Sequence, residues 1–265
     1  MIKFIAEIGL NHLGSDEIAK DYCRKLSKTK SNAVTFQVRE HDFYDGSDSW
    51  KNKLSKECYQ DCFNIIKGSN KNFGFAIGDI DAARYCAEFK PDFWKVLSWG
   101  IKDLNLIEFL VKTNKPVYVS TGMSSMNEIV LVSDKFRDKV SFIHTQLSVD
   151  ESDVNLSAIP NIKSQTSCKV SFGLHCNNLD VLGVAVAFSP DSLFVYIKDE
   201  PDFKYPDDSY AVIISDLDIV IGKTNRLYKS VGDGLKNNFL PKTLTESEQK
   251  KLSKIGRSSS NIKIG

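Results

Sequence analysis

Short runs of residues that favour β-strands recur along this chain, and stretches with helical spacing of apolar residues separate them. Eight such runs are found, at residues 2–8, 33–38, 73–77, 93–97, 116–120, 140–145, 169–173 and 192–197. Helical spacing lies between them, for example from Ile18 to Leu26 and from Leu104 to Val111. Such alternation requires parallel strands that are joined by crossover helices. Eight units of this length favour closure, so we predict a (β/α)8 TIM barrel.

A doubly wound open sheet is the alternative fold for the same alternation. That fold usually carries a glycine-rich turn with the spacing GxGxxG after its first strand. This chain has GLNHLG at residues 9–14, which lacks that spacing. The barrel is therefore favoured, as one domain over residues 1–240 of the 265. Residues 241–265 are polar and are expected to form a C-terminal cap helix and a tail.

The charges of the chain nearly balance, with 35 basic and 34 acidic residues and a net charge of +1. Such a chain has no overall field that would attract nucleic acid or an anionic membrane. No apolar segment of signal-peptide or transmembrane length is present. We therefore expect a cytoplasmic protein that binds small molecules, with neither nucleic acid nor a membrane as its partner.

The six cysteines lie mostly in apolar or helical patterns and form no CxxC pair, so reduced thiols are expected. Cys58 and Cys62 are one helical turn apart. They could bind a metal, but two packed thiols are the more common interpretation of that spacing.

In a β/α barrel the functional side chains come from the carboxyl ends of the strands and from the loops that follow. The candidate residues at these places are Glu7, Asn11, Gln37, Asp79, Lys95, Ser98, Ser120, His144, His175, Asp199 and Asp207. Structural roles are alternatives for some of them, because Glu7 could pair with Lys95 and His144 could be a hydrogen-bonded core histidine. Lys95 could also form a Schiff base, as in class I aldolases, or bind phosphate as a point charge.

Longer motifs make the chain similar to the sialic acid synthases, which condense phosphoenolpyruvate with an N-acylated amino sugar. These motifs are AEIGLNHLGS at 6–15, AVTFQ at 33–37, WKVLS at 94–98, KPVYVSTGMS at 115–124, DVNLSAIP at 153–160 and VGDGLK at 231–236. The resemblance implies a TIM barrel that makes a nonulosonic acid in carbohydrate biosynthesis. In that reaction the methylene carbon of phosphoenolpyruvate attacks the open-chain sugar aldehyde, water adds to the enol-ether carbon, and phosphate departs. A divalent metal, Mn or Mg, is the implied cofactor and polarises the aldehyde.

The resemblance also implies roles for single residues. Glu7 matches the acid/base glutamate of the family. Contacts to phosphoenolpyruvate are expected from Lys95, Ser98 and Ser120, with Lys95 also catalytic. The expected sugar site comprises Asn11, Gln37, Asp79, His144 and Asp207. His175 matches one metal-binding histidine, and Asp199 stands where the family has the second, so these two residues are the expected metal ligands. Pairing of Asp199 with Lys198 or another nearby base is the structural alternative.

The chain also departs from the family pattern. Thr35 replaces a phosphate-binding lysine, Gly173 replaces a serine, and FAIGD at 75–79 replaces the motif STPFD. The sequence ends where the antifreeze-like C-terminal domain of the family would begin, so we expect that domain to be absent. In the family this domain reaches into a partner's site. A homodimer is one assembly that the resemblance allows. Three functions remain open: a phosphoenolpyruvate-dependent synthase with an altered acceptor, an inert homologue that binds a sugar or a partner synthase, and a Lys95 Schiff-base aldolase or lyase.

Overall fold

The computed structural model describes residues 1–46, 48–232 and 245–254 of the chain. The chain divides into a compact unit over residues 1–230 and a second unit over residues 231–265. The second unit contains the helix α9 (Glu246–Lys254). The expected boundary at residue 240 and the motif residues 233–236 lie outside the described residues.

The first unit is a closed barrel of eight parallel strands, which confirms the predicted fold. The strands are β1 (Lys3–Gly9), β2 (Ala33–Val38), β3 (Asn72–Ile77), β4 (Phe93–Val96), β5 (Val117–Ser120), β6 (Val140–His144), β7 (Val170–Leu174) and β8 (Ser192–Lys198). Each strand pairs with its successor, and β1 also pairs with β8, which closes the barrel. A short strand, β9 (Val212–Ile213), adds to β8.

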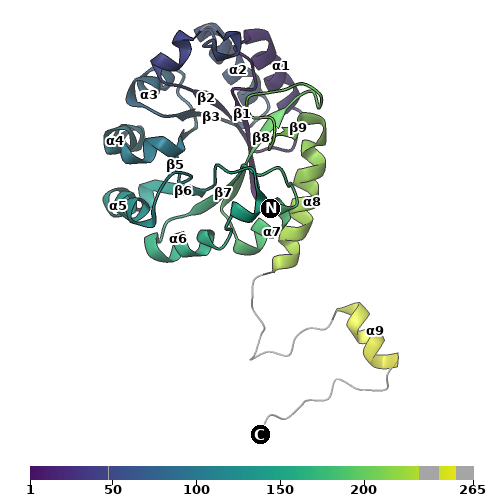
Figure 1. Ribbon diagram of the computed structural model, residues 1–265. Helices are drawn as coiled ribbons and strands as arrows, with labels where there is room; N and C mark the ends of the chain where they lie inside the picture. Colours follow the sequence, from purple (N-terminus) through teal and green to yellow (C-terminus); the bar gives the residue numbers. More distant parts are fainter. Residues whose placement is uncertain (47, 233–244, 255–265) are drawn as a thin grey trace. The chain divides into compact units, whose positions relative to one another are not determined.

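Helices surround the strands, as Figure 1 shows. They are α1 (Asp16–Leu26), α2 (Lys56–Gly68), α3 (Ile80–Ala87), α4 (Leu104–Lys112), α5 (Met126–Phe136), α6 (Ala158–Thr166), α7 (Val181–Ala185) and α8 (Leu217–Val231). Short 3-10 helices lie in the connections: η1 (His41–Asp45), η2 (Ser49–Lys51), η3 (Ser98–Lys102), η4 (Arg137–Lys139), η5 (Glu151–Asp153), η6 (Val186–Phe188) and η7 (Ile214–Asp216).

Side-chain caps fix where several helices begin. The hydroxyl of Ser15 accepts a hydrogen bond from the backbone N–H of Ile18 at the start of α1. At α5, Ser125 and Glu128 form a reciprocal capping box. Such caps satisfy N–H groups that have no partner inside the helix. The loops that precede these helices, which follow the carboxyl ends of the strands, are therefore held in defined positions.

The core has two layers. The larger one lies between the strands and the helices and includes the buried rings of Phe4, Phe36 and Phe142. A smaller cluster of Ile5, Ala33, Phe93, Ile143 and Phe194, with Tyr118 packed against it, fills the barrel interior. Because side chains alternate along a strand, residues two positions further point inward as well. Glu7, Lys95, Ser120 and Tyr196 occupy those positions and form the next layer towards the carboxyl-terminal end.

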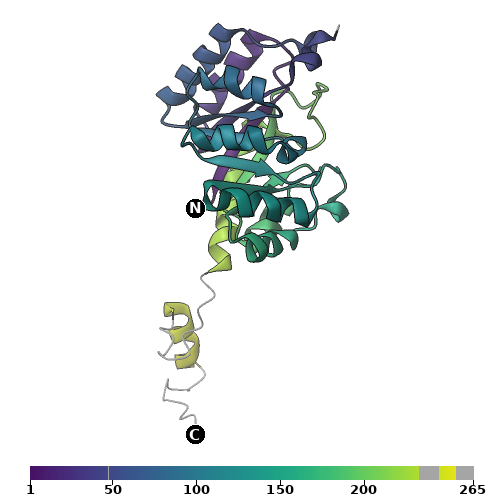
Figure 2. The same ribbon diagram turned by 90° about the vertical axis from the view of Figure 1, so that its left-hand side faces the viewer.

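The connections after β2 and β8 emerge on the side of the barrel away from the N-terminus, as the turned view in Figure 2 shows. In the described residues, no helix has the length and apolarity that crossing a bilayer requires. All six cysteines are buried free thiols, and the sulfur atoms of Cys58 and Cys62 lie 3.9 Å apart.

Candidate active site

A cavity of about 370 Å³ opens at the carboxyl-terminal end of the barrel. Side chains from several strand ends and from the loops that follow them line it: Leu10, Gln37, Arg39, Phe43, Trp50, Lys95, Leu97, Ser98, Trp99, Ser120, Leu147, His175, Tyr196, Pro206, Asp207 and Tyr210. Six of the residues expected from the sequence are among them, namely Gln37, Lys95, Ser98, Ser120, His175 and Asp207.

Glu7 and Lys95 form a buried ion pair at the inner end of this cavity. The ammonium of Lys95 donates to Oε2 of Glu7, and the two side chains are only 6% and 3% exposed. Burial raises the pKa of Glu7, while the charge of Lys95 and a hydrogen bond from Tyr196 oppose that rise. Glu7 is thus a carboxyl group whose pKa lies above its ordinary value, which suits proton exchange. Lys95 lines the cavity in front of it.

Two serine hydroxyls line the same cavity as Lys95. Oγ of Ser98, after β4, and Oγ of Ser120, at the end of β5, are 2.8 Å apart and share a hydrogen bond. Both side chains are buried. Hydroxyl groups next to an ammonium are suitable donors to a phosphate or carboxylate. The inner end of the cavity therefore has the donors that an anion needs.

Asp207, in the long loop after β8, is anchored from both sides. Its carboxylate accepts hydrogen bonds from the hydroxyl of Tyr210 at 2.8 Å and from the backbone N–H of Leu10 at 3.3 Å. Its own N–H donates to Oδ1 of Asn11 at 3.0 Å. Burial raises the pKa of Asp207, although the hydrogen bond from Tyr210 lowers it. Asp207 is thus a fixed, half-buried acid in the cavity wall.

Gly9 makes this arrangement possible at the end of β1. Its φ of +58° lies in the left-handed region, and a β-carbon there would lie 2.4 Å from Oδ2 of Asp207 and 2.6 Å from the Tyr196 ring. Only glycine meets both requirements without strain. The pairing of β1 with β2 shifts register between Glu7 and Gly9, as at a β-bulge.

His175 follows β7 and lies between aromatic rings. Its ring stacks on Tyr210 with a centroid separation of 4.6 Å and meets Tyr196 edge-on at 5.3 Å. Burial, with the charge of Lys95, lowers the pKa of His175 to about 3. The imidazole is therefore neutral at physiological pH.

Three of the expected sugar-site residues are placed elsewhere. Asp79 accepts the N–H of Ala82 as the N-cap of α3. Nε2 of His144 lies 2.9 Å from the carbonyl oxygen of Val154, and His144 does not line the cavity. This is the arrangement of a hydrogen-bonded core histidine. Asn11 also stays out of the lining and instead joins the backbones of Ile197 and Asp207.

The structure does not bring His175 and Asp199 together. Asp199 accepts from the ammonium of Lys25 on α1 at 2.5 Å and lines a different depression, against α1. Pairing with a nearby base was the structural alternative for this residue, although the base is Lys25 and not Lys198, which pairs with Asp208 at 2.6 Å. The donors needed for the expected metal site are therefore not assembled at His175.

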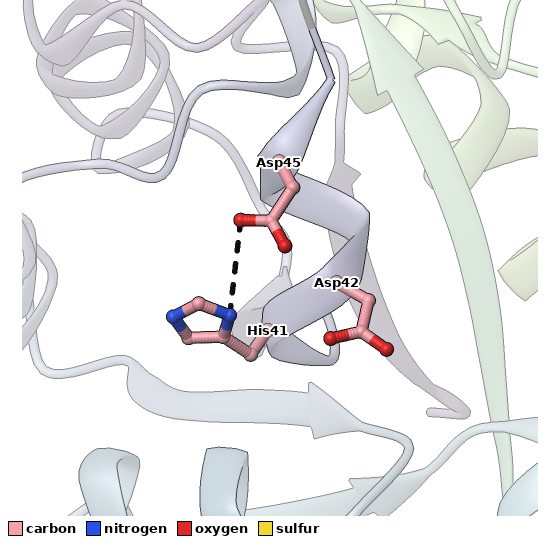
Figure 3. Close-up of side chains that lie close together, drawn as sticks. All are labelled: His41, Asp42 and Asp45. Carbon is pink, nitrogen blue, oxygen red and sulfur yellow. Dashed lines mark ion pairs between the residues drawn. The ribbon is translucent and has the colours of Figure 1, made fainter.

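Figure 3 shows a different group of metal-capable side chains, His41, Asp42 and Asp45 on η1. Their ligand atoms lie within 4.8 Å of one another, and all three residues are exposed. Nδ1 of His41 is 3.8 Å from Oδ1 of Asp45. None of the three lines the cavity.

Several lining residues were not predicted from the sequence. Tyr196 could have been found, because it continues the inward-facing series of Ser192 and Phe194 on β8. Tyr210 lies in a loop without periodicity and gave no signal. Thr35, at the position of the family's phosphate-binding lysine, is buried, and its hydroxyl has no hydrogen-bond partner in the described part of the chain.

Comparisons with known proteins give the family and support the fold. The model of the NeuB family matches residues 17–236. An uncharacterized protein from Methanocaldococcus jannaschii is 26% identical over 245 residues, which cover 88% of this chain and 72% of that protein. The N,N'-diacetyllegionaminic acid synthase of Campylobacter jejuni is 21% identical over 282 residues, covering 96% and 83%. In fold, the chain is similar to the N-acetylneuraminic acid synthetase of Leptospira borgpetersenii, with a TM-score of 0.84, 22% identity and coverage of 98% and 93%.

Proposed function

Because this chain belongs to the NeuB family, we propose that it condenses phosphoenolpyruvate with an N-acylated amino sugar to form a nonulosonic acid. The relatives include a synthase of diacetyllegionaminic acid, which supports this class of product. The observation that carries the proposal is that Lys95, Ser98 and Ser120 all line this cavity. These groups provide an ammonium and two hydroxyls for the anionic ends of phosphoenolpyruvate.

The proposed reaction forms one carbon–carbon bond and one carbon–oxygen bond, the latter from water, and breaks the carbon–oxygen bond to phosphate. The methylene carbon of phosphoenolpyruvate attacks the aldehyde carbon of the open-chain sugar, whose oxygen takes up a proton. Water then adds to the enol-ether carbon and loses a proton, and inorganic phosphate leaves. Protons must therefore be supplied and removed at the inner end of the cavity.

Glu7 is the proposed proton-exchanging group. It is in contact with Lys95, and its raised pKa favours a carboxyl that accepts and returns a proton. Glu7 does not itself line the cavity, so we propose that Lys95 carries the proton: its ammonium gives one to the aldehyde oxygen, and the proton that the added water loses returns to the Glu7–Lys95 pair through the resulting amine. Gln37 and Asp207, which line the same cavity, are the proposed contacts to the sugar.

The ion pair with Glu7 argues against Lys95 as a Schiff-base nucleophile. A nucleophilic amine must be neutral and free to attack a carbonyl. The Nζ of Lys95 instead donates to a buried carboxylate. Binding of an anion uses the same ammonium without breaking that contact, so we favour the synthase over an aldolase or lyase.

Phosphate release tests the proposal. The protein is mixed with phosphoenolpyruvate, Mn or Mg, and each of several N-acylated hexosamines, and inorganic phosphate is measured. We expect release that depends on the sugar and that Lys95→Met abolishes, while Lys102→Met, at an exposed position, retains it. Retained binding of phosphoenolpyruvate without release for any sugar would instead support an inert homologue, and borohydride trapping of a substrate on Lys95 would support the aldolase.

A further inference from the structure

Arg39, which is not among the site residues predicted from the sequence, lies at the edge of the cavity. Arg39 comes directly after β2 and lines the cavity. Its guanidinium carbon lies 4.3 Å from the centre of the Phe43 ring and 4.6 Å from that of the Trp99 ring. Guanidinium groups stack favourably on aromatic faces, and contact with two rings restricts the side chain. The charge of Arg39 is therefore positioned before any ligand binds.

Glu40 joins the parts of this arrangement. One carboxylate oxygen accepts from Nε of Arg39 at 2.9 Å, and the other accepts from the indole N–H of Trp99 at 2.5 Å. Gly78, after β3, leaves the space for them, because a β-carbon there would lie 2.0 Å from Oε1 of Glu40 and 2.4 Å from Nε1 of Trp99. We call Arg39, Glu40, Phe43 and Trp99 the arginine clamp; the segments after β2 and β4 build it, and that after β3 makes room for it.

The clamp leaves the outer part of the guanidinium available. Glu40 occupies Nε, and in the described residues neither Nη atom takes part in a hydrogen bond. The side chain of Arg39 is 23% exposed, against 6% for Lys95, so Arg39 lies nearer the solvent. The paired N–H groups of a guanidinium match the oxygens of a carboxylate or a phosphate.

We propose that the arginine clamp binds an anionic group, a phosphate ester or a carboxylate, that the acceptor sugar carries. The inference rests on the proposed function, in which phosphoenolpyruvate occupies the inner end of the cavity beside Lys95. The acceptor then occupies the outer part, with its aldehyde turned inward and its far end near Arg39. A neutral sugar would leave the outer N–H groups of Arg39, which Glu40 does not contact through a hydrogen bond, without an anionic ligand.

Binding without turnover tests this inference separately from the proposed function. The probes for calorimetric titration are an N-acetylhexosamine, its 6-phosphate and its 6-carboxylate analogue, and phosphoenolpyruvate alone. We expect the wild type to bind an anionic sugar at least about tenfold more tightly than the neutral one, as a charge-assisted pair should provide. Arg39→Gln should remove that preference, and Arg39→Lys should keep part of it. Arg84→Gln, which alters an exposed arginine outside the cavity, should not change it.

Gly78→Ala tests whether the position of the Arg39 side chain matters in addition to its charge. It keeps Arg39 but displaces Glu40 or Trp99, so the preference for the anionic sugar should fall towards that of Arg39→Gln. An unchanged preference in folded Arg39→Gln, or no preference in the wild type, overturns the inference. Loss of affinity for phosphoenolpyruvate in Arg39→Gln, with sugar binding unchanged, also overturns it, because the anion would then belong to the other substrate. An Arg39-dependent preference without phosphate release from any sugar supports the inference while the proposed function fails.

Discussion

At the scale of single residues, the ion pair between Glu7 and Lys95 is the central contact of the site. Both side chains are nearly inaccessible to water, so removing one leaves the other as an unpaired buried charge. Lys95→Met should therefore lower the free energy of unfolding by about 3–5 kcal/mol at pH 8. The double variant Glu7→Gln/Lys95→Met should recover much of that loss. Urea unfolding of the wild type, both single variants and the double variant measures the coupling, and additive effects would contradict the buried pair.

A second prediction at this scale concerns His12, which is buried next to Phe36. Burial lowers the pKa of His12 from 6.5 to about 4. Below about pH 6.5 His12 binds a proton in the unfolded chain, whereas in the folded chain it does so only below about pH 4. The free energy of unfolding therefore falls as the pH falls through that range. At pH 5 the loss from this residue should be about 2 kcal/mol relative to pH 7.

The matched variants are His12→Asn and His41→Asn, since His41 is exposed. Denaturant unfolding at pH 7 and pH 5 gives the difference in stability for each. His12→Asn should reduce that difference by about 2 kcal/mol, and His41→Asn should leave it as in the wild type. Equal pH dependence in His12→Asn and the wild type would show that His12 is protonated in the folded protein.

At the scale of elements, the carboxyl-terminal end of β1 holds the site together. Gly9→Ala places a methyl group against Asp207 and Tyr196 in a backbone conformation that alanine adopts with strain. We expect a loss of about 1–3 kcal/mol in stability and reduced sugar-dependent phosphate release. Gly68→Ala is the control, because a β-carbon at that helical position meets nothing within 4 Å, and it should be neutral or slightly stabilising. Thermal unfolding and the release assay compare them; equal behaviour of both variants would contradict a special role for Gly9.

The barrel could be predicted from the sequence, but the direction of single side chains on its strands could not. The alternation of strand-like runs and helical spacing was enough for the barrel, because parallel strands need crossover helices. The direction of His144 was not predictable, because the neighbouring Phe142 and Ile143 are both apolar and a strand buried on two faces shows no alternation. Phe142 belongs to the outer layer and Ile143 to the inner one, so His144 faces outward with Phe142.

The loops were the least predictable part. Arg39 stands two residues after Gln37, but its role depends on stacking against Phe43 and Trp99 and on the space at Gly78. Asp199 was expected beside His175 from its place after a neighbouring strand. Instead it pairs with Lys25. Contacts between residues far apart in the sequence determine the positions of Arg39 and Asp199. No local sequence pattern predicts such contacts.

At the scale of the whole molecule, the barrel brings groups from separate strands to one cavity. Its interior is filled by Ile5, Phe93 and Phe194, so the open end lies where the strands finish. The charges there alternate from Glu7 through Lys95 to Asp207, and Arg39 lies at the edge. This order fits one anionic substrate at the inner end and a second substrate in front of it, which is the arrangement that a condensation needs.

The bond that breaks in phosphoenolpyruvate tests this central claim most directly. Phosphoenolpyruvate labelled with ¹⁸O at the bridging oxygen is incubated with the protein, a divalent metal and the N-acylated hexosamine that gives the fastest phosphate release, and both products are analysed by mass spectrometry. Condensation with addition of water to the enol-ether carbon breaks the carbon–oxygen bond, so we predict that the label leaves with inorganic phosphate and that a nonulosonic acid without the label accumulates. Label retained in pyruvate or in a sugar acid would show that the phosphorus–oxygen bond breaks, and would contradict the account.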